Sequence, residues 1–365
     1  MKKVSFETKN ILYFSFCAII LTFFVGWIGY SIFENRYPSI FEIWNRWDTK
    51  MYLRIAEIGY PFTDEGRFLI TVLPFYPYLI RFTSFLLRDN LASALFISNL
   101  CFITSLIYLY KLIRLDFPQK VAWRSILYLS IFPTAYFLHS GYSESLFLML
   151  VIISIYLARK GKWFMASSFG MLAVLSRITG IIILPFLLAE YLQSKKFDYH
   201  KVKSDILWLG LLPLGSLLYL LINYKIFGNP FEFLTSLRVF FWEQPSLPWH
   251  GIIRAFSRFS LLQPADWMIE GAMVILFWIF GIIMLFASIR KVRFSYNVFS
   301  WLSFLFVSST TTLSSLPRFL LMFFPFFIVL ALWGKNQTKH FFITFVSISL
   351  QCIFLILFVR EHWAF

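Results

Sequence analysis

Long apolar runs recur along the whole chain, and they constrain the fold more than any other feature of the sequence. A helix that crosses a bilayer needs about 20 mostly apolar residues. Only 14% of the 365 residues are charged, against about 25% in soluble domains. The sequence therefore predicts an all-α polytopic membrane protein with about 11 transmembrane helices. The predicted spans are 11–33, 91–110, 124–139, 144–158, 163–176, 180–193, 205–222, 271–289, 296–313, 318–333 and 341–358.

Two apolar segments need separate interpretation. The first run, 11–33, is too long for the core of a signal peptide and lacks a small-residue cleavage site after it, so we expect a retained helix. The run 71–87, "TVLPFYPYLIRFTSFLL", contains Pro74, Pro77 and Arg81. These residues favour a re-entrant or interfacial segment over a full crossing.

The distribution of basic residues supports this threading. With the N-terminus inside, the segments assigned to the cytoplasm hold 19 Lys and Arg against 5 Asp and Glu, so nearly all of the net +15 charge lies there. Short cytoplasmic loops are rich in Lys and Arg in membrane proteins. The excess positive charge therefore faces a membrane leaflet, and no nucleic-acid partner is expected. If 71–87 were a full crossing, every later loop would change sides and the basic clusters would lie outside the cytoplasm.

This topology divides the chain into three predicted parts. Residues 1–222 form a transmembrane module whose first outer loop is 34–90, residues 223–270 form a second outer loop, and residues 271–365 contribute helices that complete the same bundle. Long loops with their own pattern often carry function. We therefore expect the functional site on the non-cytoplasmic face.

The first outer loop contains the stretch "WDTKMYLRIAEIGY", residues 47–60. Trp44, Trp47, Met51, Ile55 and Ile58 follow one another at helical spacing and form one apolar stripe. A helix of this kind lies in the membrane interface, with its tryptophans at headgroup depth. The spacing predicts an amphipathic helix over 49–58.

Asp48 stands at the start of this helix and has two compatible interpretations. Aspartate is a favoured N-cap residue, and Gly59 suits the C′ position that ends the helix. Amides at a helix N-terminus also keep a carboxylate ionised. Spacing alone leaves a capping role and a functional role equally open.

Other polar residues meet the outer boundary where predicted spans end. His139, Tyr142 and Glu144 belong to the turn "FLHSGYSESLF", and arginines occur in "LSRITG", "SLPRFLL" and the 71–87 run. Ionisable residues at membrane depth are candidates for function, and arginine binds phosphate in bidentate fashion. Taken singly, each arginine can be an interfacial snorkelling residue, His139 a helix-end residue and Glu144 a helix-start residue. The arginines are Arg81, Arg177 and Arg318.

Several classes of site find no support in the sequence. It has no metal-ligand spacing, phosphate-binding Gly-rich loop or nucleophile elbow. Cys17, Cys101 and Cys352 all lie in apolar runs and do not form a disulfide framework. Asp64 and Glu65 are an adjacent acidic pair that is a weak candidate for a divalent cation, with a solvated loop as the alternative.

The ordered motifs resemble a known family. The segments "WDTKMYLRIAEIGYP", "LPFYPYLIR", "FPTAYFLHSGYSESLF", "SRITGIIILP" and "PRFLLMFFP" follow the order seen in PIG-V-like proteins. These proteins are relatives of the GPI mannosyltransferase that adds the second mannose, within the GT-C class of membrane glycosyltransferases. The resemblance covers roughly 40–190 and about 315–326. The acidic residues after Gly59-Tyr60 depart from the usual Tyr-x-Glu pattern, which leaves the acceptor open.

The resemblance implies a GT-C-type bundle and an enzyme that uses a polyprenyl- or dolichyl-phosphate-linked sugar on the non-cytoplasmic face. Mannose is the sugar that the eukaryotic relatives imply. The essential acidic residue of the family matches Asp48, which we expect to act as general base. Trp47 and Tyr52 are expected substrate contacts, and Tyr142 and Glu144 are expected to orient the acceptor or Arg177. Neutralisation of the leaving lipid phosphate is expected from the arginines Arg81, Arg177 and Arg318.

No cofactor is required by this mechanism, and a divalent cation at Asp64 and Glu65 is the alternative left open. The expected partners are the lipid-linked donor, a glycan or lipid acceptor and membrane lipids. The membrane is the plasma membrane in a prokaryote and the endoplasmic reticulum in a eukaryote. The alternatives are a transporter or flippase of a lipid-linked sugar, for which inverted repeats are common but not evident here, and a non-catalytic scaffold in which Asp48 is only a cap.

Overall fold

The structure is a computed structural model that describes residues 6–34, 39–259 and 265–362. These residues contain helices and no strand, apart from one isolated bridge between Pro245 and Thr310. The predicted all-α class is confirmed. The α-helices are α1 Phe6–Glu34, α2 Asp48–Ile58, α3 Asp64–Leu69, α4 Phe75–Leu87, α5 Asn90–Ile113, α6 Gln119–Ser130, α7 Glu144–Arg159, α8 Trp163–Ser176, α9 Ile183–Ser194, α10 Leu211–Phe227, α11 Glu232–Phe241, α12 His250–Arg258, α13 Ala265–Ser288, α14 Phe294–Ser308, α15 Leu316–Leu320, α16 Phe324–Trp333 and α17 Gln337–Val359.

Short 3-10 helices extend or precede several of these elements. They are η1 Glu42–Trp44, η2 Ala135–Leu138, η3 Ile178–Ile182, η4 Tyr199–Lys201 and η5 Ser204–Gly210. Two of them run directly into an α-helix, η3 into α9 and η5 into α10. The apolar stretches 178–194 and 204–227 are therefore continuous helical segments.

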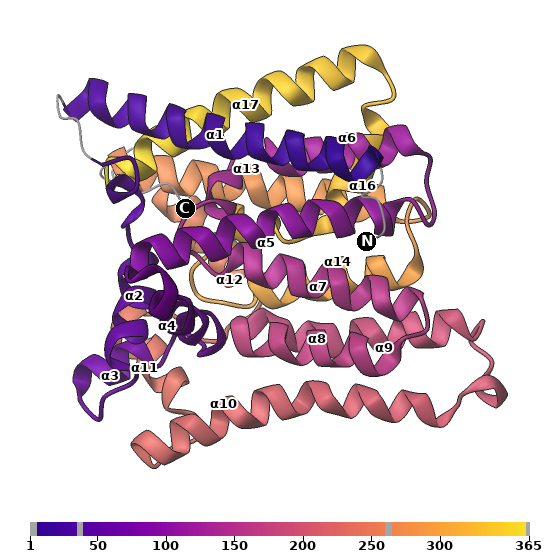
Figure 1. The fold of residues 1–365 in the computed structure, drawn as a ribbon, viewed down its shortest axis with the longest axis horizontal. Coiled ribbons are helices and arrows are strands. Elements are labelled where there is room, and N and C mark those ends of the chain that lie inside the picture. The colour runs from indigo at the N-terminus through magenta and orange to yellow at the C-terminus, as the bar shows by residue number, and fades with distance from the viewer. Residues whose placement is uncertain (1–5, 35–38, 260–264, 363–365) are drawn as a thin grey trace. The chain divides into compact units, whose positions relative to one another are not determined.

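The chain forms two compact units. The first comprises the described residues within 1–57, 76–156 and 330–362, and the second comprises those within 58–75 and 157–329. In the first unit, α1 packs along α5 and α17, and α5 packs on α6 (Figure 1). In the second unit, α8 packs on α10, α9 on α14, and α13 on α12 and α15. The predicted division at 222 and 270 follows the sequence order and stays a prediction.

Five helices are long and apolar enough to cross a membrane. They are Phe6–Glu34, Asn90–Ile113, Ser204–Phe227, Glu270–Ser288 and Gln337–Val359, and each coincides with a predicted span. Four further apolar helices of 10–17 residues lie at other predicted spans, at Trp163–Ser176, Ile178–Ser194, Phe294–Ser308 and Phe324–Trp333. These helices support an integral membrane protein. The total of 11 crossings stays a prediction.

Three predicted spans differ from the helices observed. The run 124–139 ends as α-helix at Ser130 and resumes as η2, because Pro133 has no N–H to continue the helix. The run 296–313 ends at Ser308, where "SSTTTLSS" replaces apolar residues. The run 318–333 is divided into α15 and α16, with Pro325 near the start of the second helix.

The first predicted outer loop contains α2, α3 and α4. The helix predicted over 49–58 is observed as α2, and Gly59 follows it with a positive φ of 78°, which is the left-handed conformation of a C′ glycine. The 71–87 run contains α4, whose 13 residues span about 20 Å. That length falls short of the roughly 30 Å hydrocarbon core. The interfacial or re-entrant placement of this segment stays a prediction.

Candidate active site

Asp48 is the first residue of α2, and its backbone is tied to the Tyr-Ser-Glu turn. The Asp48 N–H donates to Tyr142 Oη at 3.3 Å, and Tyr142 Oη donates to the Arg46 carbonyl at 3.4 Å. Trp47, immediately before the helix, has a φ of 47°, a left-handed conformation that is uncommon for a bulky residue. The buried Tyr142 therefore fixes the backbone on both sides of Trp47, at Arg46 and at Asp48. The Asp48 residue itself is half-buried.

The next turn of α2 packs on the same segment. Tyr52 Oη and Ser143 Oγ lie 2.8 Å apart in a buried hydrogen bond. The Tyr52 ring meets the rings of Tyr142 and Tyr76 edge to face, with centroids 6.3 and 4.9 Å away. These contacts join Tyr52 of α2 to Tyr142, so two of the predicted substrate-site residues lie together. Trp47, another predicted substrate contact, is 42% exposed.

Gly141 makes this packing possible. A Cβ at this position would lie 2.7 Å from Cγ2 of Thr49 and 3.4 Å from Cβ of Ala94. Thr49 is fully buried and adjoins Asp48 in α2. Only a residue without a side chain lets the turn approach α2 this closely.

Glu144 and His139 flank the turn and are fully buried. Glu144 is the first residue of α7, where the helix dipole favours a carboxylate. His139 Nδ1 lies 2.9 Å from Oδ1 of Asn99, and its ring contacts Phe102 edge to face. Glu144 thus lies at the start of α7 and His139 directly after η2, the positions on which their structural alternatives rest. Their orientation of an acceptor stays a prediction.

Arg81 lies at the other end of α2. Its Nε donates to the Ala56 carbonyl at 2.5 Å, and its Nη2 donates to the Ile55 carbonyl at 3.2 Å. The last carbonyls of a helix lack partners within the helix and carry partial negative charge. Arg81 therefore stabilises the C-terminal end of α2, a role that the sequence did not suggest.

Arg177 and Arg318 belong to the second unit and converge on one aromatic ring. Their guanidinium carbons lie 5.3 and 5.8 Å from the centroid of Phe319. Arg177 is buried in the extended connection between α8 and η3, and Arg318 lies in α15. Two guanidinium groups held on one ring form a local concentration of positive charge that suits an anion.

A carboxylate that was not predicted from the sequence, Glu243, lies beside Arg318. Residues 242–246 pair with 309–311 through Ser246 N to Ser309 O at 2.9 Å and Thr311 N to Gln244 O at 3.1 Å. This pairing brings the half-buried Glu243 to Thr310 and Arg318. Burial raises the pKa of Glu243 above its usual value, while the positive charge of Arg318 and a hydrogen bond with Thr310 lower it in part. No local pattern signals this contact, because it joins segments more than 60 residues apart.

The acidic pair Asp64 and Glu65 lies in the first turn of α3. Both side chains are exposed, and the helix is capped by Thr63 Oγ1, which accepts from Gly66 N at 3.3 Å. Acidic residues are favoured in a first helical turn. Among the residues that the structure describes, no three His, Cys, Asp or Glu side chains gather as metal ligands. A cation at this pair stays a prediction.

Residues 72–214 match the family model of the dolichyl-phosphate-mannose-protein mannosyltransferases, a GT-C family. This match supports a GT-C glycosyltransferase. The matched segment contains Arg81, Tyr142, Glu144 and Arg177, whereas Asp48 and Arg318 lie outside it. The finer PIG-V-like resemblance stays a prediction.

Solved structures of an archaeal oligosaccharyltransferase from Archaeoglobus fulgidus are similar in part. The complex with zinc and sulfate shares 15% identity at a TM-score of 0.45 and covers 95% of this chain and 53% of its own. The complex with an inhibitory peptide and a dolichol-phosphate shares 13% identity at a TM-score of 0.42 and covers 98% and 56%. This chain thus spans little more than half the length of those structures. No curated protein sequence matches it.

Proposed function

We propose that this protein is an inverting membrane glycosyltransferase. It takes a hexose, mannose in our proposal, from a polyprenyl- or dolichyl-phosphate carrier and transfers it to an acceptor hydroxyl on the non-cytoplasmic face. The observation that carries the proposal is the pair Arg177 and Arg318 on Phe319, since a lipid-borne phosphate is the anion expected among apolar helices. The match of residues 72–214 to a mannosyltransferase family supports the reaction class and the choice of sugar.

Asp48 acts as the general base in this proposal. One of its carboxylate oxygens takes the proton of the acceptor hydroxyl as that oxygen forms a bond to the anomeric carbon. The bond from the anomeric carbon to the phosphate oxygen breaks, and the lipid phosphate leaves with the electron pair. Because attack comes from the face opposite the leaving group, the anomeric configuration inverts, through a transition state with oxocarbenium character.

Arg177 and Arg318 receive the negative charge that develops on the leaving phosphate. Guanidinium groups bind phosphate oxygens through parallel N–H donors, and their effect increases where water is scarce. Since these groups carry the neutralising charge, the transfer requires no metal ion. We expect activity to be unchanged by EDTA, as measured by sugar transfer before and after chelation.

The role of Asp48 is tested with purified protein, labelled polyprenyl-phosphate mannose or glucose, and a membrane extract as the source of acceptor. Asp48→Asn keeps the shape of the side chain and removes the base, so transfer should fall by about 100-fold or more. Asp198→Asn is the matched control, because Asp198 only caps η4 and pairs with Lys201. Wild-type transfer by a folded Asp48→Asn protein would refute the assignment.

The phosphate-binding role is tested with the same assay. Arg177→Gln and Arg318→Gln should each raise the KM for the lipid donor by about tenfold or more, since each removes charged hydrogen bonds to the phosphate. Arg238→Gln serves as the control, because Arg238 is an exposed arginine of α11. An unchanged donor KM in both test variants would remove the basis of the proposal.

A further inference from the structure

The helix α12 has the composition of a membrane-interface helix. Ile252 and Ala255 are buried against the protein, whereas Ile253 and Phe256 are 59% and 58% exposed. Trp249, just before the helix, is also exposed. Tryptophan and exposed apolar residues beside arginines are typical of helices at headgroup depth. α12 therefore presents both apolar and basic side chains that suit a lipid surface.

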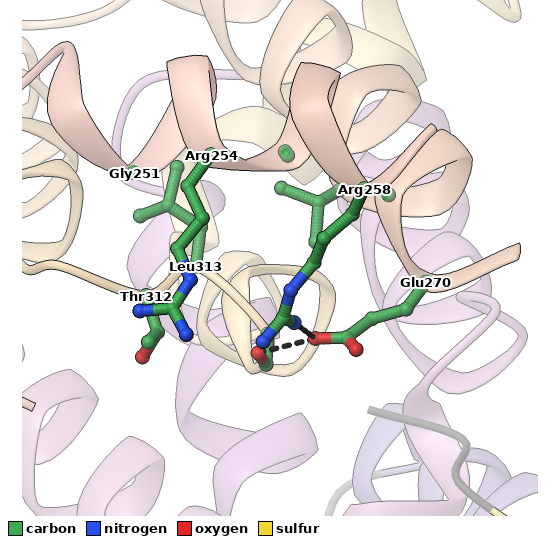
Figure 2. Close-up of a pocket in the computed structure, with 10 residues that line it drawn as sticks. Gly251, Arg254, Arg258, Glu270, Thr312 and Leu313 are labelled. Carbon is green, nitrogen blue, oxygen red and sulfur yellow. Dashed lines mark hydrogen bonds and ion pairs between the residues drawn. The ribbon is translucent and has the colours of Figure 1, made fainter. Parts of the chain in front are cut away.

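A small pocket lies against the polar side of this helix. Figure 2 shows Arg254 and Arg258 extending from α12 toward Thr312 and Leu313, with Glu270 entering from α13. Gly251, Gly271 and Ser314 complete the polar and backbone lining. The two arginines and one carboxylate leave the pocket with an excess positive charge.

The carboxylate in the pocket, that of Glu270, already has two partners within the protein. Arg258 forms an ion pair with Oε1 of Glu270, and the Ser314 hydroxyl donates to the same oxygen. Arg254 forms no ion pair with any residue that the structure describes. Its guanidinium nevertheless points into the same space (Figure 2). Because the charge of Glu270 is balanced by Arg258, the positive charge of Arg254 is left to bind an external anion.

The size of the pocket limits what can enter it. Its volume is about 10 Å³, enough for a single water-sized group. A sugar ring or a prenyl chain does not fit, but one oxygen of a phosphate does. The remainder of such a ligand has to lie outside, where Trp249, Ile253 and Phe256 are exposed.

We propose that Arg254, with Thr312 beside it, binds the phosphate of a membrane lipid, and that α12 holds the apolar part of that lipid. The lining of this pocket includes neither Arg177 nor Arg318, and its proposed role does not depend on sugar transfer. The phosphate belongs either to a bulk anionic phospholipid or to the polyprenyl carrier. Both have the same charged group, and the experiment below separates them.

The test measures lipid binding by full-length protein in neutral detergent micelles, with no sugar donor present. Three probes are used in turn: phosphatidylglycerol, undecaprenyl phosphate and inorganic phosphate alone. Arg254→Gln should weaken binding of at least one lipid probe about tenfold. Arg254→Lys should weaken lipid binding less, because lysine retains the positive charge and lacks only the planar guanidinium group with its paired N–H donors. Arg238→Gln, an exposed arginine outside the pocket, should bind as the wild type does.

The three probes distinguish which lipid binds at Arg254. Weakening confined to phosphatidylglycerol identifies a bulk-lipid site, and weakening confined to undecaprenyl phosphate identifies a carrier site. Competition by inorganic phosphate in the wild type, absent in Arg254→Gln, locates recognition at the phosphate. Equal affinities of Arg254→Gln and wild type for every probe, or equal losses in Arg254→Gln and Arg238→Gln, overturn the proposal. Because no transfer is measured, an inactive protein leaves this test intact.

Discussion

At the scale of single residues, Glu243 lies beside Arg318, one of the two arginines proposed to bind the phosphate of the lipid donor. It faces Arg318 and Thr310, and burial raises its pKa. An ionised Glu243 offsets part of the charge with which Arg318 would bind phosphate. Protonation removes that competition, and the raised pKa means that it occurs at a higher pH than for an exposed glutamate.

The first prediction concerns the pH dependence of donor binding. The KM for polyprenyl-phosphate mannose should fall as the pH decreases through the pKa of Glu243, because the protonated side chain no longer neutralises Arg318. Glu243→Gln should have a KM lower by up to about fivefold at neutral pH and should lose this pH dependence. The KM is measured from neutral to mildly acidic pH, with the exposed Glu57→Gln as control. A Gln variant that keeps the wild-type profile would contradict the assignment.

The second prediction concerns Gly141, where α2 meets the turn that holds Asp48. Gly141→Ala places a methyl group 2.7 Å from Cγ2 of Thr49, and such overpacking costs about 1–3 kcal/mol. Thermal unfolding should occur at a lower temperature, and transfer should weaken because Asp48 is displaced. Gly210→Ala is the matched control, since a methyl group at Gly210 would meet no atom within 4 Å.

A rescue variant makes this prediction sharper. Thr49→Ser deletes the Cγ2 atom and leaves the hydroxyl, so the double variant Gly141→Ala/Thr49→Ser should recover much of the lost stability and activity. Such recovery is the coupling expected of two residues in contact. Purely additive losses would show that the close approach of Gly141 and Thr49 is not what positions α2.

At the scale of elements, α2 illustrates which features a sequence can predict. Its helical character and its terminal Gly59 are local properties and were observed, although the helix begins at Asp48 and not after it, so Asp48 is a helical residue and not the predicted N-cap. The prediction that the apolar stripe faces the membrane interface was wrong for Trp44, Met51 and Ile55, which are buried within the protein. The bonds from Arg81 to Ile55 and Ala56 were not predictable, because α4 meets α2 only after folding. The same reason hides Glu243, which backbone pairing across the chain brings to Arg318.

The third prediction separates two roles of Arg81. If it acts by holding the C-terminal end of α2, Arg81→Gln should lower kcat, because Asp48 is on the same helix, and leave the donor KM nearly unchanged. Arg81→Lys should recover only part of the rate, since one ammonium replaces two directed N–H donors. Steady-state kinetics with the lipid donor measure both constants. A higher KM with an unchanged kcat would instead support the phosphate contact suggested by the sequence.

At the scale of the whole molecule, hydropathy identified where apolar helices lie but not how each is built. The five long helices follow from composition alone. The shorter ones contain prolines, 3-10 turns or breaks, as between α6 and η2 or α15 and α16, and a window of mean hydropathy averages over these features. The hydropathy pattern does not indicate on which side of the membrane a loop lies. That assignment comes from the distribution of Lys and Arg among the loops.

The last prediction tests that side directly. In a chain whose Cys17, Cys101 and Cys352 are replaced by serine or alanine, a single cysteine is placed at Phe62 or at Tyr199. These two aromatic positions are 75% and 76% exposed, so a difference in labelling reflects the side of the membrane and not accessibility within the protein. A membrane-impermeant maleimide should label Phe62→Cys in intact cells and Tyr199→Cys only after permeabilisation. The opposite pattern would put the loop that carries Asp48 in the cytoplasm, and the donor would then have to be reached from the inner leaflet.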